Sequence, residues 1–177
     1  RINMPDVAEQ ILANGQADMV SMARPLLADS QWVNKAKAGK SALINTCIAC
    51  NQACLDHVFE NKKAGCLVNP RACRETELNY LPTKTKKRIA VVGSGPAGLS
   101  FATVAAERGH AVTVFDAAAE IGGQFNYAKQ IPGKEEFHET LRYYSNMLAK
   151  HHVEVKLNHL TNADELSKSG FDEIILA

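Results

Sequence analysis

The sequence lacks the features that direct a chain to a membrane or to nucleic acid. Its 177 residues contain no secretory signal and no apolar run near the ~20 residues of a membrane-spanning helix. The 20 Lys and Arg residues nearly balance the 19 Asp and Glu residues, so the formal net charge is only +1. Such a chain has no global field that attracts polyanions. We therefore expect a cytoplasmic protein whose partners include neither nucleic acid nor a membrane.

Internal repeats and low-complexity tracts are also missing, which excludes solenoids and disordered tails. The sequence has no initiator methionine, and it has no turn after the apolar stretch at 171–177. Natural chains rarely stop inside a strand, because the partners of that strand and its following loop must come from somewhere. These two absences predict a fragment whose partner is the rest of its parent polypeptide, and which is inactive alone.

Cysteine is scarce but concentrated, since four of the five cysteines fall within 20 residues. Cys47, Cys50, Cys54 and Cys66 have the spacing C-x2-C-x3-C-x11-C. Two tight steps and one return loop can bring four thiolates together around a cubane iron–sulfur cluster or a tetrahedral zinc ion. The pattern therefore predicts a metal centre.

An iron–sulfur cluster is the favoured occupant of this centre, and zinc is the alternative. Zinc ribbons usually pair one C-x2-C with another, whereas here the fourth ligand comes singly. Four unrelated buried thiols are disfavoured because free cysteines seldom cluster so densely. Disulfides are disfavoured because no secretory signal is present. Cys73, seven residues beyond Cys66, has no place in the motif and is interpreted as a structural thiol.

The first 43 residues have the order of elements found in a β/α barrel. A helix is predicted at 5–14, a buried strand at 17–22 and a second helix near 30–38. Arg24 stands just past the expected strand, where barrel loops build phosphate sites. The Arg24 guanidinium and the backbone N–H of Ala23 would bind such a phosphate. The alternative is a solvated surface arginine.

From residue 88 onward the pattern changes to a dinucleotide-binding βαβ unit. An apolar strand at 89–92 is followed by Gly93-Ser94-Gly95-Pro96-Ala97-Gly98, and a helix is predicted at 97–108. A second strand at 111–115 ends at Asp116, 18 positions beyond the last glycine. A G-x-G-x-x-G between a strand and a helix, with an acidic residue ~20 positions further on, is typical of such a site.

Each part of this motif has a physical role. Gly93 permits the tight turn, Gly95 lets backbone N–H groups approach a pyrophosphate, and Gly98 lets the helix pack close to the strand. Asp116 would accept hydrogen bonds from the ribose hydroxyls of the adenosine. The alternative is a purely structural strand–turn–helix connection.

The remaining segments complete this second domain. The loop at 120–124 contains a glycine pair that can approach the same dinucleotide. A helix is predicted at 135–151, a third strand at 152–157 and a short helix capped by Asn162. Four histidines without metal-like spacing are interpreted as surface residues: His138, His151, His152 and His159.

These segments define the expected organisation. Residues 1–43 form the end of a phosphate-binding β/α (TIM) barrel, and 44–73 form an iron–sulfur segment. Residues 74–87 form a polar linker, and 88–177 form the first part of a Rossmann-like dinucleotide-binding domain. The predicted fold class is α/β, with both the barrel and the dinucleotide domain incomplete.

In this order the three parts resemble the bacterial 2,4-dienoyl-CoA reductases (NADPH). These are iron–sulfur flavoenzymes of the old-yellow-enzyme and trimethylamine dehydrogenase family. The similarity rests on Ala17-Asp18 with residues 22–27, on the cysteine-containing segments 47–56 and 66–70, and on the glycine loop at 93–99. Residues 120–124 and 131–135 narrow it to the dienoyl-CoA reductase branch.

The resemblance implies a set of cofactors. Ala23 and Arg24 would bind the FMN phosphate, and the four clustered cysteines would ligate a 4Fe–4S cluster. FAD would be held by the glycine loop with Pro96 and Ala97, by Asp116 and Gln124, and near its adenine by Thr161. The NADPH site and the acid–base residues would lie outside this chain, so no catalytic residue is assigned.

The implied reaction reduces a 2,4-dienoyl-CoA, an unsaturated fatty acyl-CoA, to an enoyl-CoA. Electrons would pass from NADPH to FAD, then to the 4Fe–4S cluster, FMN and substrate. Alternatives are a family member of the NADH oxidase or amine dehydrogenase type, an electron-transfer flavin and iron–sulfur subunit, or a zinc-stabilised binding module.

Overall fold

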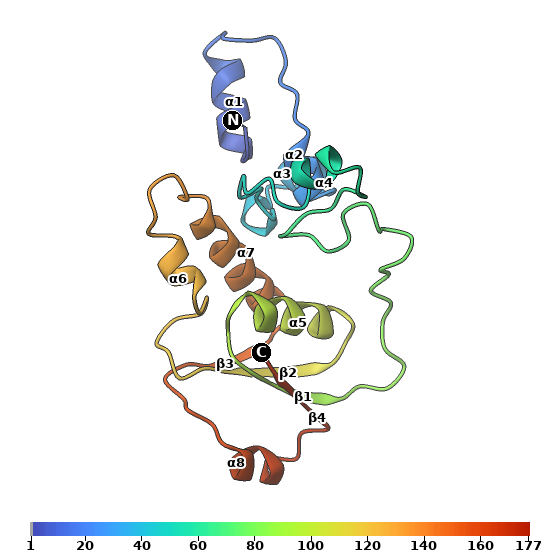
Figure 1. The fold of residues 1–177 in the computed structure, drawn as a ribbon, viewed down its shortest axis with the longest axis vertical. Helices are drawn as coiled ribbons and strands as arrows, with labels where there is room; N and C mark the ends of the chain where they lie inside the picture. Colours follow the sequence, from blue (N-terminus) through green and yellow to red (C-terminus); the bar gives the residue numbers. More distant parts are fainter. Residues whose placement is uncertain (1) are drawn as a thin grey trace. The chain divides into compact units, whose positions relative to one another are not determined.

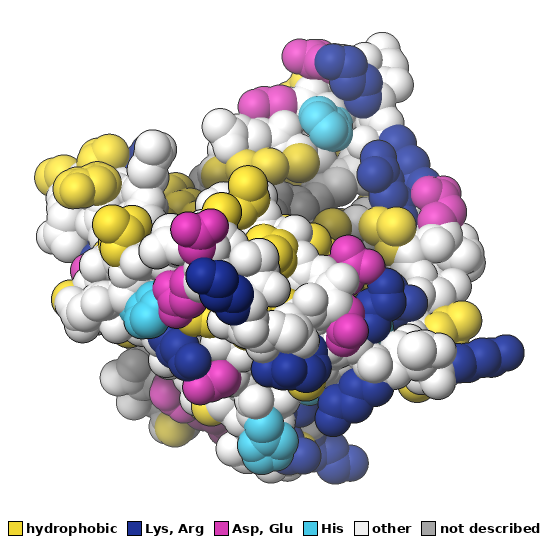
Figure 2. All heavy atoms as spheres, turned by 90° about the horizontal axis from the view of Figure 1, so that it is seen from below, with side chains coloured by type: hydrophobic (Ala, Val, Ile, Leu, Met, Phe, Trp, Pro, Cys, Tyr) yellow, Lys and Arg dark blue, Asp and Glu magenta, His cyan; other side chains and the backbone are white. Residues whose placement is uncertain are grey.

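The computed structural model describes residues 2–177, which divide into two compact units. The first unit comprises residues up to Asn79 together with His138–Tyr143. The second comprises Tyr80–Phe137 and Tyr144–Ala177. Acidic and basic side chains are interspersed over the face shown in Figure 2, as the balanced charge predicts. Among the described residues, no helix combines the length and apolar character that crossing a bilayer requires.

The first unit contains short helices joined by loops. They are α1 (Pro5–Ala13), α2 (Arg24–Ala28), α3 (Trp32–Lys37), the 3-10 helix η1 (Ser41–Leu43) and α4 (Leu55–Phe59). The predicted first helix is confirmed, with Pro5 in its first turn and Gly15 at φ +65° just past its end.

A buried hydrogen-bond network around Asp29 fixes the order of these short elements. Asp29 is 6 % exposed, and its carboxylate accepts from the ammonium group of Lys35 and from the backbone N–H of Asn45. The indole N–H of buried Trp32 donates to the carbonyl of Asn3 over 2.9 Å. Helices of five or six residues are marginal alone, so these bonds and their packing hold the unit together.

The predicted buried strand at 17–22 is wrong. This stretch is irregular, and Met19 is 75 % exposed. A strand needs a neighbour for its N–H and C=O groups, and the described part of the first unit contains no other strand. Arg24 is also not in a loop, because it is the first residue of α2.

The second unit is built on a parallel sheet (Figure 1). Its strands are β1 (Arg88–Val92), β2 (Ala111–Phe115), β3 (Glu154–Lys156) and β4 (Glu173–Leu176), in the order β3-β2-β1-β4. Every neighbouring pair is parallel. Helix α5 (Pro96–Glu107) connects β1 to β2 and packs against both strands (Figure 1). The predicted strands and crossover helix are confirmed within a few residues.

Three further helices complete the second half of the chain: α6 (Phe125–Ala128), α7 (Phe137–Lys150) and α8 (Ala163–Lys168). The sequence did not predict α6. In the second unit, α7 buries Tyr144, Met147 and Leu148, which share one helical face. Asn162 caps α8 as predicted, since its side-chain oxygen accepts from the backbone N–H of Glu165 over 2.9 Å.

The interpretation of His151 as a surface residue is right only in part. Its side chain is half-buried, and its ring Nε2 is buried without a hydrogen-bond partner among the described residues. Burial lowers the pKa of this imidazole, and the charge of neighbouring Lys150 lowers it further. Folding therefore favours the neutral form of His151.

The pH dependence of stability tests this environment. Because the folded pKa of His151 lies below its unfolded value of about 6.5, the unfolded chain binds more protons as pH falls through that value. The free energy of unfolding should therefore decrease between pH 7 and 5, and His151→Gln should flatten this decrease. Denaturant titrations at several pH values measure it. An unaltered slope in His151→Gln would contradict the assignment.

Candidate functional site

The four clustered cysteines line one cavity in the first unit. Cys47 is buried, Cys50, Cys54 and Cys66 are partly buried, and all are free thiols. The space between them that no atom fills is about 310 Å³, including its opening to solvent. Its other walls are mostly apolar: Leu27, Ile48, Ala53, Leu67 and Val68, with Arg24 and Asn51 as the polar members. The predicted ligand residues thus meet at one place.

The loops that carry the thiols have unusual backbone geometry. Ala49 and Asn51 have φ angles of 54° and 63°, in the left-handed region that non-glycine residues adopt at a cost of roughly 1–2 kcal/mol. Burial raises the pKa of the Cys66 thiol, while the backbone N–H groups of Val68 and Asn69 donate to its sulfur and oppose that rise. Strained residues and N–H groups aimed at a sulfur are features of a shaped binding site.

Hydrogen bonds from other parts of the first unit hold this segment. The side-chain N–H of Asn45 donates to the carbonyl of Val68 over 2.6 Å. The side-chain N–H of Asn3 donates to the backbone carbonyl of Cys47 over 3.2 Å. The guanidinium of Arg142 donates to the carbonyl of Ile44 over 2.7 Å and to that of Ala42. The backbone leading into the first cysteine is therefore fixed by side chains distant in sequence.

Arg24 borders two cavities of the first unit. Its guanidinium donates to the side-chain oxygen of Asn51 and lines the cysteine cavity. Arg24 also lines a second hollow of about 440 Å³, together with Ser21, Met22 and Ala23. Asn3 lines that hollow too, and its side-chain oxygen is buried without a partner among the described residues. The structure thus places the two predicted phosphate-binding residues at this hollow.

In the second unit, the glycine loop follows the carboxyl end of β1. Gly93 has φ +108°, and a Cβ there would lie 2.2 Å from the carbonyl oxygen of Ala177. A Cβ on Gly98 would lie 2.0 Å from the carbonyl oxygen of Gly93. A Cβ on Gly95 would meet no atom within 4 Å. Gly93 and Gly98 are therefore required by the fold, whereas Gly95 faces open space.

Asp116 fastens the glycine loop to the end of β2. Its carboxylate accepts from the backbone N–H of Ser94 over 2.7 Å, from the Ser94 hydroxyl, and from the N–H of Ala118 over 2.8 Å. Burial raises the pKa of Asp116, but these hydrogen bonds outweigh it and lower that pKa below its ordinary value. The side chain is a fixed anion at the carboxyl edge of the sheet.

Two more loops meet the glycine loop at this edge. The N–H of Gly122 donates to the carbonyl of Ser94 over 2.8 Å, which brings the loop before α6 against it. The N–H of His159 donates to the carbonyl of Asp116 over 2.9 Å, so the loop after β3 also lies there. Parallel sheets bind ligands at the carboxyl ends of their strands, where these loops gather.

The other predicted residues of this site have identifiable places. Pro96 and Ala97 form the first turn of α5, and Gln124 stands at the start of α6. The hydroxyl of Thr161 donates to Glu165 over 2.8 Å, within the loop that follows β3. Each lies on an element that begins or ends near the carboxyl edge.

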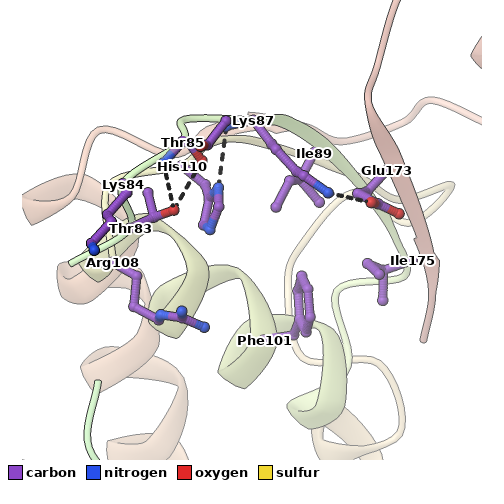
Figure 3. A pocket seen from close by; sticks show the side chains of 10 residues that line it. All are labelled: Thr83, Lys84, Thr85, Lys87, Ile89, Phe101, Arg108, His110, Glu173 and Ile175. Atoms are coloured by element: carbon purple, nitrogen blue, oxygen red, sulfur yellow. Dashed lines mark hydrogen bonds and ion pairs between the residues drawn. The ribbon is translucent and has the colours of Figure 1, made fainter. Parts of the chain in front are cut away.

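A separate hollow lies at the opposite edge of the sheet, at the amino ends of β1 and β4 (Figure 3). Phe101 and Ile175 form part of its apolar wall, and Lys87 pairs with Glu173 over 2.6 Å at its rim. Because the glycine loop stands at the carboxyl edge, this hollow is not part of the dinucleotide site.

Three residues of these sites were missed by sequence reasoning. Asn51 and Ser94 lie inside the motifs and Arg142 lies in α7, and the partners of all three are distant in sequence. Asn51 carried a signal, since asparagine adopts a positive φ more readily than most residues.

The interpretation of Cys73 as a structural thiol is wrong. Cys73 is exposed, with φ 60°, so its thiol has no packing role.

Two parts of the chain match models of known families. Residues 1–42 match the NADH:flavin oxidoreductase / NADH oxidase family, and residues 91–159 match an NAD(P)-binding Rossmann-like domain. Over these parts the chain is similar to old-yellow-enzyme-type NADH:flavin oxidoreductases and to dinucleotide-binding domains, and the predicted α/β fold class is confirmed.

Individual relatives match the whole chain. It is 42% identical over 181 residues to a metal reductase of Desulforamulus reducens, covering 100% of this chain and 27% of the relative. It is 36% identical to a bilirubin reductase of Mediterraneibacter gnavus, covering 100% and 28%. A solved structure of 2-naphthoyl-CoA reductase matches with a TM-score of 0.97 and 38% identity, covering 100% and 27%. The chain thus spans about a quarter of the length of these relatives.

Proposed function

We propose that this chain is the electron-transferring middle of an NAD(P)H-dependent iron–sulfur flavoprotein oxidoreductase. The observation that carries the proposal is the meeting of Cys47, Cys50, Cys54 and Cys66 at one cavity with mostly apolar walls. In this proposal the four thiolates bind a 4Fe–4S cluster.

The donor set fits a cluster better than one zinc ion. Zinc binds thiolates at ~2.3 Å, which places tetrahedral sulfur ligands only about 3.8 Å apart. Zinc ribbons usually pair one C-x2-C with another, whereas here Cys66 comes singly from a distant loop. In a cubane each thiolate binds a different iron, so the ligands stand farther apart around a shared space.

The remaining cofactors follow the same proposal. Ala23 and Arg24 bind the phosphate of FMN at their hollow, and the glycine loop with Asp116 binds FAD. Gln124 and Thr161 border the FAD site. An iron–sulfur cluster carries one electron and a hydride carries two, whereas flavins transfer either one or two. FAD, the cluster and FMN can therefore pass electrons from one to the next. NADPH binds at a site outside this chain.

For the substrate we propose a conjugated acyl-CoA, reduced as in a 2,4-dienoyl-CoA reductase. The name of the 2-naphthoyl-CoA reductase supports an acyl-CoA, and a cinnamate reductase of Clostridium sporogenes that is 31% identical supports a conjugated substrate. The second candidate is an amine dehydrogenase, because a histamine dehydrogenase of Rhizobium matches with a TM-score of 0.87 and 28% identity. Assays of the natural protein with NADPH and a 2,4-dienoyl-CoA, and with histamine and an electron acceptor, separate the two.

Metal and sulfide analysis tests the core of the proposal. The natural protein containing this chain, purified without air, should carry about four iron and four acid-labile sulfide per chain. It should be brown and should give an electron paramagnetic resonance signal on one-electron reduction. Stoichiometric zinc without sulfide in protein never exposed to air would overturn the assignment.

The glycine loop gives a separate test of FAD binding. Gly95→Val adds a branched side chain where the structure leaves open space, so the fold should survive. The same side chain would fill the place where backbone N–H groups meet a pyrophosphate, so FAD should be lost while FMN is retained. Flavin extraction and chromatography measure both. Full FAD content in folded Gly95→Val protein would show that the dinucleotide binds elsewhere.

A further inference from the structure

Arg24 is the one cation among the described residues that line the cysteine cavity. The other lining residues are the four cysteines, apolar side chains and Asn51. A guanidinium stays protonated at every physiological pH, so this charge is permanent. The position of the Arg24 guanidinium relative to the four thiols determines how strongly its charge acts on them.

Asn51 determines that place. It stands between Cys50 and Cys54, and its side-chain oxygen accepts a hydrogen bond from Nη1 of Arg24. Its own backbone is fixed, because its carbonyl accepts from the N–H of Asp56 in the first turn of α4 over 3.1 Å. Its φ of 63° suits asparagine better than most residues. The amide is therefore a rigid anchor for a long, flexible side chain.

The consequence for electron transfer is electrostatic. Reduction of a four-thiolate cluster by one electron, without a proton, adds one negative charge to a site that is already anionic. A fixed positive charge beside it stabilises the reduced form more than the oxidised form. The effect is strong where apolar walls exclude water, because charges interact more strongly at low dielectric.

We propose that Asn51 is a positioning residue that holds Arg24 beside the four thiolates and thereby raises the reduction potential of the cluster. The proposal rests on the proposed function, since it requires the cluster. Arg24 then has two roles, a positive charge beside the thiolates and a contact to the FMN phosphate, because the same side chain borders the hollow assigned to that phosphate.

The test is a redox titration of the natural protein, followed by electron paramagnetic resonance. Asn51→Gly keeps a residue that tolerates φ 63° but removes the acceptor oxygen. We expect full iron content and a cluster harder to reduce by about tenfold in equilibrium constant, ~59 mV for one electron. Asn61→Gly is the matched control, because exposed Asn61 also has a positive φ (55°) and does not line the cavity. Its potential should equal that of the wild type.

A double variant separates positioning from a direct effect of the amide. In an Arg24→Met background, Asn51→Gly should produce no further shift, because the charge that it positions is already gone. An unchanged potential in Asn51→Gly, or an equal shift in both backgrounds, would overturn the inference. If the wild type carries no iron and sulfide, the proposed function itself has failed, and that result is distinguishable before any variant is titrated.

Discussion

Gly98→Ala should strongly destabilise the second unit. The added Cβ would lie 2.0 Å from the carbonyl oxygen of Gly93 and 3.3 Å from the Cβ of Ala177. The nearest clash is with backbone, so no rotamer change relieves it, and α5 must move away from β1. Overpacking typically costs about 1–3 kcal/mol, and a backbone clash this close belongs at or above the upper end. Circular dichroism melts and denaturant titrations measure the loss.

The matched control is Gly95→Ala, the same substitution three residues earlier in the same loop. A Cβ at Gly95 meets no atom within 4 Å, so the free energy of unfolding should change by less than about 1 kcal/mol. Equal stability of the two variants would contradict the close approach of helix and strand at Gly98. FAD binding is a separate readout, since it tests the pyrophosphate site and not the packing.

Cys54→Ala should abolish binding of the proposed iron–sulfur cluster. The change removes one of four thiolates and leaves one iron without its ligand. The local fold does not need this thiol, because Cys54 precedes α4 without a side-chain cap, and its backbone carbonyl accepts the N–H of Val58. Loss of iron and sulfide would therefore report ligation. Anaerobic metal analysis and absorbance near the visible cluster band measure it.

Cys73→Ala is the control for this variant, because Cys73 is exposed and lies outside the cavity. Its iron and sulfide content should match that of the wild type. Full iron content in Cys54→Ala, or equal loss in both variants, would contradict the four-cysteine assignment.

The second unit could be predicted almost completely from the sequence. Strands β1, β2 and β4 contain short apolar runs, and β3 lies in an alternating stretch. The glycine motif after β1 is typical of a strand–turn–helix connection. The range 111–115 for β2 and the capping of α8 by Asn162 are examples, because each depends on neighbours in sequence. Helix α6 was missed because four residues give too short a periodic pattern.

The first unit was harder to predict because its order comes from contacts distant in sequence. The stretch at 17–22 has the composition of a strand, but a strand forms only where another strand pairs with it. The cysteine spacing indicated which residues gather, yet it did not reveal that Arg24 reaches Asn51 or that Arg142 holds the carbonyl of Ile44. Likewise, nothing local shows that Asp116 bonds to Ser94, 22 positions earlier.

The pairing of β1 with β4 can form only some seconds after β1 has been synthesised. The N–H of Ala177 donates to the carbonyl of Val92, and the chain must add 177 − 92 = 85 residues before that bond can form. At ~5–20 residues per second, the ribosome needs roughly 4–17 s to do so. During that interval β1 is not yet paired with β4, and Gly93 is not yet packed against Ala177. The nascent glycine loop can therefore complete its packing only after β4 has been synthesised.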